Sequence, residues 1–395
     1  MSDWEQTASI TRREVLLGAG AAVMLGASGC SDSGAAELGP VVYVGTYTAP
    51  NTAPGGDVPS TAIGIYVFRM DMSTGGLTPI QTVASANPAY LALHPTLPVL
   101  YTCNETDPGS VSAYSIAADG QLTLVNSQPS NGAWPTHLSV HPSGKYLMAA
   151  NYGTGNVPVF ALTSSGSIGT MTANFQGQGN GSGPNKGRQE GPHAHQVITD
   201  PAALHVFDVD LGADKVNVLN LNLATGALTA NEVPFANTAA GSGPRHMVFH
   251  PNRQHAYVLK ELVADVDVFD YEEVRGALVW KQSISTLPSG FTGVKSGAEI
   301  RVTPNGKFLY TTNRGHNSVA GFSIGSDGKL TMLGTFPSGG VWPRGMSIDP
   351  TGAFLYVMNQ NSDNILVYKI GADGTLSASG TVINTPVPVD MLFGR

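Results

Sequence analysis

The feature that most constrains the fold of this chain is an internal repeat, because a fixed period of this kind predicts stacked or ring-like units. Six segments start with a similar short strand, and successive units are 43–57 residues long. The segments begin PAYLALHP at Pro88, PTHLSVHP at Pro135, PHAHQVITDP at Pro192, PRHMVFHP at Pro244, SGAEIRVTP at Ser296 and PRGMSIDP at Pro343. Each start is followed by a tight turn, two further strand-like runs, another tight turn and a fourth run. Four antiparallel strands in this length match one blade of a β-propeller.

A seventh unit is split between the two ends of the repeat region. Residues 41–85 supply a second, third and fourth strand, and residues 386–395 supply the missing first strand. Pairing of these ends would close a seven-bladed ring and remove the open sheet edges. A linear β-solenoid is the alternative, but it gives no reason for the ends to complement each other. We therefore predict an all-β, seven-bladed propeller over residues 41–395.

Composition supports this fold and excludes one class of partner. Only 12% of residues are charged, about half of the roughly 25% typical of globular domains. The 48 Gly and 26 Pro residues are consistent with many short turns. Net charge is −8 and no basic cluster occurs, so nucleic acid is not an expected partner.

The first 30 residues are expected to be an export signal rather than part of the fold. Arg12 and Arg13 form a twin-arginine pattern, and the apolar run 15–27 is too short to span a bilayer as a helix. The run ends in AlaSerGlyCys, which resembles a bacterial lipoprotein cleavage site, although Ala27 replaces the usual Leu. The alternative is a buried N-terminal helix. Export by the twin-arginine route would place the protein in the periplasm, or at a membrane if Cys30 is lipidated.

Residues 31–40 read as a flexible tether between this signal and the propeller. Cys103 is the only other cysteine, and lipidation of Cys30 would leave it without a disulfide partner. We expect Cys103 to be a buried thiol, and we expect the protein to be monomeric.

One face of the predicted ring carries all the long connections, which in repeat architectures usually marks the binding side. These are residues 49–61, 176–191, 236–243 and 286–297. The opposite face has short turns, where His94, His141 and His250 are expected to hydrogen-bond neighbouring turns.

Polar residues recur where the second strands end at the long-loop face. Ten residues after the turn proline lie Glu105, Tyr152, Glu261, Arg314 and Gln360, and a count of nine gives Asp210 in the fourth blade. The starts of the first strands add His193, His195, Arg245, His246, Glu299 and Arg344. Solvation of a water-filled channel would explain Glu105, Tyr152 and Gln360. Several charges and two imidazoles converging in so charge-poor a chain favour a ligand site instead, formed by His193, His195, Arg245, Glu261 and Arg314.

Other motifs are weak. The Gly-rich stretch 177–187 lacks the strand-to-helix context of a phosphate loop, no Cys/His set has zinc spacing, and no acidic loop matches a calcium pattern. No metal and no cofactor are expected.

The chain resembles the seven-bladed propeller lactonases, the family of the propeller-type 6-phosphogluconolactonase and of fungal carboxymuconate-lactonising enzyme. The resemblance covers residues 41–395 and keeps the order and spacing of the motifs. They are VGTYT (44–48), ANYG (150–153), GPHAH (191–195), DLGAD (210–214), GPRHMVFHP (243–251), AEIRVTPNGKFLY (298–310), NRGHNS (313–318) and WPRGMSIDPTG (342–352).

The resemblance implies a site of one His, two Arg and one Glu. By motif these are His193 or His195, Arg245, Arg314 and Glu261. The family's frequent pair of small hydroxyl residues after the Glu is replaced here by Val263 to Asp265. The leader is the larger departure, since the pentose-phosphate lactone forms in the cytosol.

These observations predict a lactone hydrolase acting on a sugar-acid or related lactone. A histidine or Glu261 would serve as base, and Arg245 and Arg314 would hold the oxyanion and a substrate anion. His246, His316, Arg344, Glu299 and Asp210 are expected to bind substrate. The alternatives are a non-catalytic periplasmic propeller that binds a ligand or protein, and a cycloisomerase acting on a muconate-like diacid.

Overall fold

The structure is a computed structural model, and it describes residues 39–49, 59–181 and 183–394. These residues belong to one compact unit. The predicted export signal and nearly all of the predicted tether lie outside the described residues, so lipidation of Cys30 stays a prediction. No helix among the residues described is long and apolar enough to cross a membrane.

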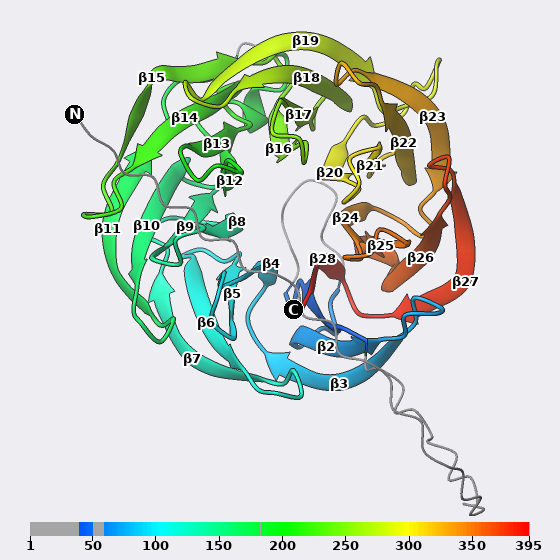
Figure 1. Cartoon of the computed structure of the whole chain (residues 1–395), viewed down its shortest axis with the longest axis horizontal. Helices are drawn as coiled ribbons and strands as arrows, with labels where there is room; N and C mark the ends of the chain where they lie inside the picture. The colour runs from blue at the N-terminus through cyan, green and yellow to red at the C-terminus, as the bar shows by residue number, and fades with distance from the viewer. Residues whose placement is uncertain (1–38, 50–58, 182, 395) are drawn as a thin grey trace, which may run out of the picture. The chain divides into compact units, whose positions relative to one another are not determined.

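Seven four-stranded antiparallel sheets are arranged as blades around a central axis, which confirms the predicted fold (Figure 1). Blade 1 contains β28 (Pro388–Phe393), β1 (Val41–Thr46), β2 (Gly64–Met70) and β3 (Leu77–Ala84). Blade 2 contains β4 (Pro88–Leu93), β5 (Val99–Asn104), β6 (Ser110–Ile116) and β7 (Leu122–Pro129). Blade 3 contains β8 (Pro135–Val140), β9 (Tyr146–Asn151), β10 (Asn156–Leu162) and β11 (Ile168–Gln176). Blade 4 contains β12 (Ala194–Thr199), β13 (Val206–Asp210), β14 (Lys215–Leu221) and β15 (Leu228–Asn237).

The remaining blades follow the same order from the inner to the outer strand. Blade 5 contains β16 (Pro244–Phe249), β17 (His255–Lys260), β18 (Asp265–Glu272) and β19 (Ala277–Ser285). Blade 6 contains β20 (Gly297–Val302), β21 (Phe308–Asn313), β22 (Ser318–Ile324) and β23 (Leu330–Pro337). Blade 7 contains β24 (Pro343–Ile348), β25 (Phe354–Asn359), β26 (Asn364–Ile370) and β27 (Leu376–Asn384). Two short 3-10 helices are described, η1 (Lys186–Arg188) and η2 (Gln360–Ser362).

The two ends of the propeller complete one blade, as the split repeat predicts. Strand β28 pairs antiparallel with β1, with Tyr43 opposite Leu392 and Val44 opposite Met391. In Figure 1 this last strand lies beside the blue strands of the N-terminal end. This pairing gives blade 1 its fourth strand and closes the ring.

The hydrophobic core lies between adjacent blades. Second strands such as β21 are buried along their whole length, whereas outer strands such as β7 alternate between exposed and partly buried residues. One core cluster combines Tyr101 of blade 2 with Leu147 of blade 3 and Val389 of blade 1. Cys103 belongs to the same cluster and is a buried free thiol, as predicted. Because each blade buries its faces on two neighbours, the ring fixes the positions of the inner strands.

Repeated polar contacts connect neighbouring blades at the short-turn face. In five blades a tyrosine hydroxyl of the second strand donates to a glycine carbonyl in a turn of the next blade. The pairs are Tyr43–Gly120 (3.1 Å), Tyr101–Gly166 (2.6 Å), Tyr257–Gly328 (3.0 Å), Tyr310–Gly374 (2.8 Å) and Tyr356–Gly75 (2.8 Å). The predicted histidine contacts are present for His94, whose Nε2 lies 3.0 Å from Gly144 O, and for His250, 2.8 Å from Gly306 O. His141 bonds Ser143 Oγ within its own turn (2.9 Å) and the backbone of Ala203 in the neighbouring turn of blade 4.

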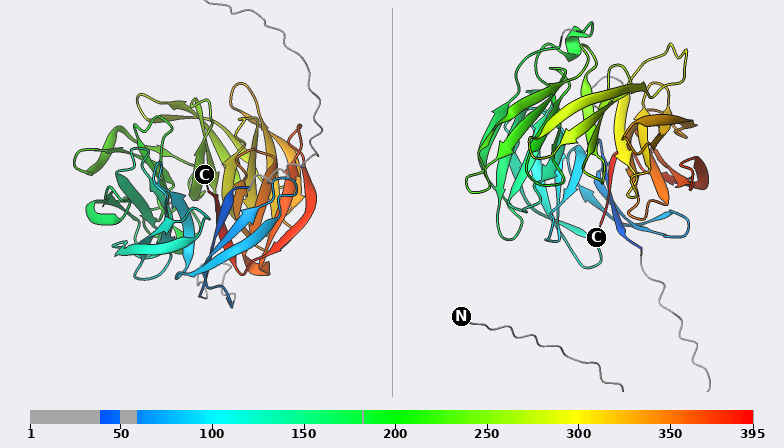
Figure 2. Two further views of the ribbon diagram at one scale, coloured as in Figure 1. Left: turned by 60° about the horizontal axis from the view of Figure 1, so that its bottom comes forward. Right: turned by 45° about the horizontal axis from the view of Figure 1, so that its top comes forward.

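The long connections lie at the other end of the ring, where the second strands finish. The loop with η1 joins β11 to β12, and residues 286–296 join β19 to β20. Both rise from the same end in the right-hand view of Figure 2. This end therefore carries the elaborated loops.

Candidate active site

Seven equivalent positions mark the ends of the second strands. In blade 5, Pro244 pairs with Lys260, and the amide of the next residue, Glu261, donates to Gly243 O (2.7 Å). Arg314 of blade 6 has the same arrangement, donating to Ser296 O (2.8 Å). The full set is Tyr47, Glu105, Tyr152, Leu211, Glu261, Arg314 and Gln360.

The strand register corrects one sequence assignment, because blade 4 contributes Leu211 and not Asp210. Asp210 pairs with Ala194 as Lys260 pairs with Pro244, and the Leu211 amide donates to His193 O (3.0 Å). The Asp210 carboxylate accepts the amides of His193 (2.8 Å) and Ala213 (3.0 Å). Asp210 therefore holds the backbone of two turns, and this position does not support a direct contact with substrate.

A second set of equivalent positions follows the start of each first strand. A bulge lies between Pro244 and His246 in β16, between Pro343 and Gly345 in β24, and between Ala194 and Gln196 in β12. The residues at the bulge in these three blades are Arg245, Arg344 and His195. The sequence left open which histidine of GPHAH takes the place of Arg245, and the register shows that it is His195.

Glu261 is the centre of a group of four arginines and two glutamates that we call the arginine cluster. Its Oε1 lies 2.8 Å from Arg188 Nη2, and its Oε2 lies 2.7 Å from Arg314 Nη2 and 3.2 Å from Arg245 Nε. The cluster comprises Arg188, Arg245, Arg314, Arg344, Glu105 and Glu261, contributed by blades 2, 5, 6 and 7 and by the loop after β11.

The charges around Glu261 keep its carboxylate ionised. Burial alone would raise the pKa of Glu261, which is 2% exposed. The three guanidinium groups outweigh burial, that of Arg314 most strongly, and hold the pKa of Glu261 well below its usual value. A carboxylate stabilised in this way accepts a proton poorly, so the geometry favours Glu261 as an anchor for arginines rather than as a base.

Arg245 and Arg314 are nearly fully buried, with exposed fractions of 3% and 4%. Each is also held by a main-chain carbonyl, Arg245 by Ala298 O and Arg314 by Gly297 O (3.0 Å). The Nε atom of Arg314 is buried and has no hydrogen-bond partner in the part of the chain that the structure describes. A buried guanidinium donor without a partner is unfavourable in a folded protein.

Arg344 extends the cluster toward blades 1 and 2. Its Nη2 lies 3.6 Å from Glu105 Oε2, and its guanidinium carbon lies 5.1 Å from the centre of the Tyr47 ring. The Tyr47 hydroxyl donates to the same Glu105 oxygen at 2.6 Å. Glu105 therefore pairs with a specific charged residue, Arg344. The sequence alone was also consistent with a Glu105 that is only solvated by water in the channel.

Arg188 also belongs to the cluster, but counting along the strands of the sequence did not identify it. It lies in η1, and its Nε donates to the Tyr152 hydroxyl at 2.7 Å. Strand counting cannot find a residue in a loop of irregular length. The one feature of the sequence that could have identified Arg188 is its place in the longest loop of the predicted binding face.

The two histidines of GPHAH have different surroundings. His195 is 3% exposed, its ring centre lies 5.1 Å from that of His246, and its Nδ1 has no hydrogen-bond partner among the described residues. Burial, followed by Arg245 and other nearby cationic groups, lowers the pKa of His195 well below its usual value, so this imidazole is neutral at pH 7. His193 stacks on Tyr152, with ring centres 4.5 Å apart, and its Nδ1 lies 2.7 Å from Tyr152 O.

A second layer of polar residues lies beneath these groups, one position further along the first strands. His246 Nδ1 lies 3.1 Å from Glu299 Oε1, and Arg301 Nη1 lies 2.6 Å from the same oxygen. Arg245 Nη1 approaches both ring nitrogens of His246, at 3.4 and 3.5 Å. His246 therefore contacts Arg245, and Glu299 holds His246 in place.

His316 is not brought into the cluster by any contact described. Its Nδ1 bonds Ser318 Oγ (2.8 Å) and its ring contacts that of Phe291, with centres 4.8 Å apart. The sequence expectation that His316 binds substrate gains no support from this arrangement.

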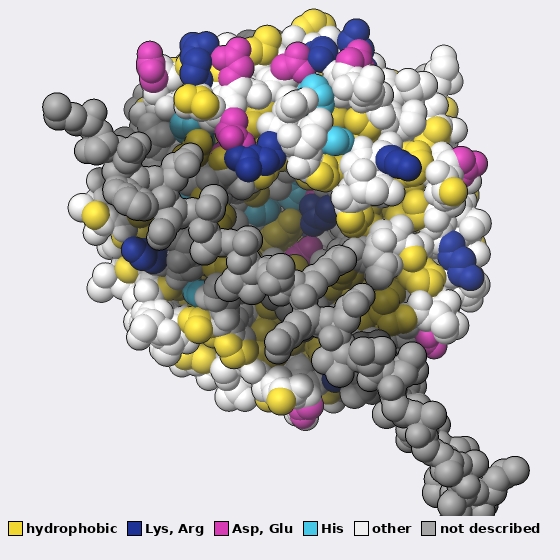
Figure 3. All heavy atoms as spheres, viewed as in Figure 1, with side chains coloured by type: hydrophobic (Ala, Val, Ile, Leu, Met, Phe, Trp, Pro, Cys, Tyr) yellow, Lys and Arg dark blue, Asp and Glu magenta, His cyan; other side chains and the backbone are white. Residues whose placement is uncertain are grey.

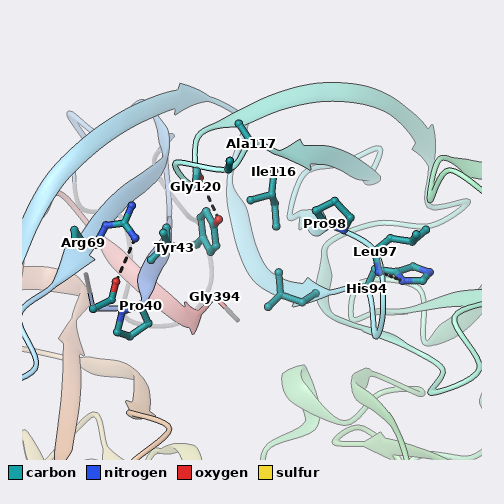
Figure 4. A pocket seen from close by; sticks show the side chains of 14 residues that line it. Pro40, Tyr43, Arg69, His94, Leu97, Pro98, Ile116, Ala117, Gly120 and Gly394 are labelled. Carbon is teal, nitrogen blue, oxygen red and sulfur yellow. Dashed lines mark hydrogen bonds between the residues drawn. The ribbon is translucent and has the colours of Figure 1, made fainter. Parts of the chain in front are cut away.

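The centre of the ring is hollowed, and histidine, basic and acidic side chains are visible within it (Figure 3). A separate pocket of about 440 Å³ lies between blades 1 and 2 at the short-turn face (Figure 4). It is lined mainly by apolar and backbone groups around Tyr43, Leu97 and Ile116, and Arg69 donates there to Gly39 O (3.2 Å). No set of three or more His, Cys, Asp or Glu placed to hold a metal occurs among the residues described. The converging titratable groups are therefore in the centre of the ring and not in the Figure 4 pocket.

Comparison with known proteins relates this arrangement to enzymes. The family model "Lactonase, 7-bladed beta-propeller" matches residues 41–393. A 6-phosphogluconolactonase of Bacillus subtilis is 35% identical over 311 residues, which cover 78% of this chain and 84% of the relative. One from Yersinia pestis is 34% identical over 286 residues, covering 72% of this chain and 80% of that protein. The solved structure of a periplasmic gluconolactonase of Pseudomonas aeruginosa superposes with a TM-score of 0.84 at 29% identity, covering 91% of this chain and 99% of that one.

Proposed function

The chain belongs to the family of seven-bladed β-propeller lactonases, and on this premise we propose that it hydrolyses the lactone of a sugar acid within the arginine cluster. One observation carries the proposal most directly. Arg314 Nε, a hydrogen-bond donor, and His195 Nδ1 are both buried without hydrogen-bond partners among the described residues. His195 Nδ1 can accept a proton when the imidazole carries its hydrogen on Nε2. Lactone opening needs these two capacities, a donor for the carbonyl oxygen and a base for water.

His195 is proposed as the general base. Its imidazole is neutral at pH 7 and therefore available to accept a proton from a water molecule as the water oxygen bonds to the carbonyl carbon. Arg245 and Arg314 stabilise the negative charge that develops on the carbonyl oxygen, because guanidinium groups remain charged and donate several hydrogen bonds. The ring C–O bond then breaks, and the protonated imidazole returns its proton to the leaving oxygen. The product is the open hydroxy acid.

Glu261 and the lower layer have positioning roles in this proposal. Glu261 fixes three guanidinium groups at distances of 2.7–3.2 Å, while His246 contacts Arg245 and is itself held by Glu299. Preorganised donors require no reorientation when charge develops, which is the main source of such stabilisation. Arg344 is placed to bind substrate hydroxyl or anionic groups.

The proposed activity predicts acid release from lactones. In a pH-stat assay with a panel of aldonolactones, phosphorylated and not, the protein should accelerate opening of at least one member above the spontaneous rate. Binding of lactones without acid release would indicate a non-catalytic propeller instead. Consumption of a muconate-type diacid to form a lactone would indicate a cycloisomerase.

The pH dependence of the reaction tests the assignment of His195. A base must be unprotonated in the free enzyme, and burial together with Arg245 lowers the pKa of His195 below its usual value near 6.5. We therefore expect kcat/KM, after subtraction of spontaneous hydrolysis, to stay level as pH falls from 8 through 6.5 and to decline only at lower pH. A decline centred at or above about pH 6.5 would contradict this assignment.

We also propose export, from the twin-arginine pattern, the apolar run 15–27 and the similarity to a periplasmic gluconolactonase of Pseudomonas aeruginosa. A substrate met outside the cytosol would then differ from the lactone formed there. The intact mass of the mature protein, which reports cleavage before Cys30 and any attached lipid, tests this part of the proposal.

A further inference from the structure

We propose that Arg188 is a specificity-determining residue that binds an anionic group, a carboxylate or a phosphate, on the part of the lactone remote from the reacting carbonyl. This inference rests on the proposed lactonase function, and it assigns a task to the arginine of the cluster that comes from the long loop between β11 and β12.

The location of Arg188 separates it from the arginines that support the chemistry. Arg245 lies on the inner strand β16, Arg314 directly follows the second strand β21, and both are held by main-chain carbonyls of blade 6. Arg188 reaches the cluster from η1, with a side-chain exposure of 16% compared with 3% and 4% for the other two. Its guanidinium is therefore nearer to the entrance, where the distal part of a bound substrate would lie.

The charge of the cluster favours an anionic ligand. Its four guanidinium groups are matched by only two carboxylates, Glu105 and Glu261, and His195 is neutral at pH 7. Burial and the neighbouring Arg314 lower the pKa of Arg245 to about 9, which reflects the same excess of positive charge. An excess of positive charge within a largely buried cluster is unfavourable, and an anionic substituent would offset it.

The loop that carries Arg188 is anchored at the adjacent residue. Gln189 is completely buried, and its side-chain nitrogen Nε2 donates to Leu211 O (3.0 Å) and to Asp214 Oδ1 (2.8 Å). Asp214 also accepts the amides of Gly241 (2.7 Å) and Gly243 (2.9 Å), which lie in the neighbouring long loop. This network fixes η1 against blade 4, so Arg188 is held in place before a ligand binds, which reduces the entropy lost on binding.

The contacts of Arg188 itself are suited to positioning an anion. Its Nε donates to the Tyr152 hydroxyl (2.7 Å), and one terminal nitrogen pairs with Glu261 (2.8 Å). These two contacts fix the plane of the guanidinium group. A planar, fixed fork can bind a carboxylate or phosphate through parallel hydrogen bonds.

The test compares lactones that differ only in their distal group. For Arg188→Gln, the ratio of kcat/KM for 6-phosphogluconolactone to that for neutral gluconolactone should fall by about ten- to a hundredfold, the effect of one charged hydrogen-bonding contact. The loss should appear mainly in KM, because the contact is made equally in the ground and transition states. A lactone of a sugar diacid, assayed in parallel, shows whether a carboxylate can replace the phosphate.

Two control variants make the result specific. Lys186→Gln removes one exposed positive charge from the same helix and should leave the ratio within about twofold, as expected for a screened surface charge. Arg188→Lys keeps the charge but loses the fork, and should restore only part of the ratio. An equal loss for both lactones in Arg188→Gln would show that Arg188 acts only through Glu261 and would overturn the proposal, as would an unchanged ratio.

A binding measurement keeps the test independent of catalysis. If the wild-type protein hydrolyses no lactone, the proposed function fails, but thermal shifts with 6-phosphogluconate and gluconate still report the site. The phosphorylated acid should raise the Tm of the wild type more than gluconate does, and Arg188→Gln should abolish that difference. Equal shifts from the two acids in the wild type would refute an anion site at Arg188.

Discussion

Glu261→Gln is expected to lower kcat/KM by at least about a hundredfold and to reduce the free energy of unfolding by about 3–5 kcal/mol. The carboxylate is 2% exposed and lies within 3.2 Å of nitrogen atoms of three arginines. Glutamine has nearly the same shape, so the substitution removes charge while leaving little change in volume.

The expected loss of stability follows from the positive charges that remain. Without the carboxylate, three buried guanidinium groups lose their counter-charge, and the new amide presents N–H donors to groups that are themselves donors. Their mutual repulsion would displace Arg245 and Arg314 from the positions in which they stabilise the oxyanion. Activity and stability should therefore fall together.

Urea unfolding and the lactone assay measure the two effects. Glu272→Gln is a suitable control, because it breaks an exposed pair with Arg275 (2.9 Å) and should change stability by less than about 0.5 kcal/mol. Added phosphate should raise the Tm of Glu261→Gln more than that of the wild type, since an anion can replace the missing charge. A variant with wild-type activity and stability would show that Glu261 does not organise the arginines.

The fold could be predicted from the sequence because its determinant is periodic. Repeated starts such as those at Pro244 and Pro343 mark inner strands, and the split unit predicted the pairing of β28 with β1 that the register shows. Each blade has the same local pattern of strands and turns. The place of a residue within its repeat unit therefore predicts where that residue lies in its blade.

Much of the site could be predicted for the same reason, and the errors occur where the period is interrupted. Glu261 and Arg314 follow from counting along strands, and they form an ion pair of 2.7 Å. Blade 4 was misaligned because Asp210 is polar and Leu211 is not, although Leu211 has the equivalent backbone position. Arg188 was missed because a loop has no register.

The charge state of Glu261 could not be predicted from the sequence either. Counting placed one carboxylate near two arginines, which left a role as base open. The third arginine, Arg188, and the burial of the whole group change that interpretation, because together they hold the pKa of Glu261 well below its usual value. Such an effect depends on distances between residues far apart in the chain, which a repeat pattern does not encode.

Arg314→Ala is expected to reduce kcat by about 10²–10³, the loss seen when one donor to an oxyanion is removed. Arg314 is 4% exposed, its Nη2 is fixed by Glu261 and Gly297 O, and its Nε has no hydrogen-bond partner among the described residues. A donor used only as negative charge develops lowers kcat and kcat/KM together, whereas a contact already made with the bound lactone would mainly change KM. Steady-state kinetics on a neutral lactone distinguish the two outcomes.

Two further variants separate chemistry from packing in the Arg314 test. Arg314→Lys retains the positive charge but cannot bond Glu261 and the carbonyl oxygen at once, so it should recover only part of the lost rate. Arg275→Ala, at an exposed surface pair, should keep wild-type kinetics and stability. Arg314→Ala leaves Glu261 with Arg188 and Arg245, so its fold should persist, as near-ultraviolet circular dichroism can verify. Near-normal hydrolysis by a folded Arg314→Ala protein would exclude Arg314 from oxyanion stabilisation and leave Arg245 as the donor.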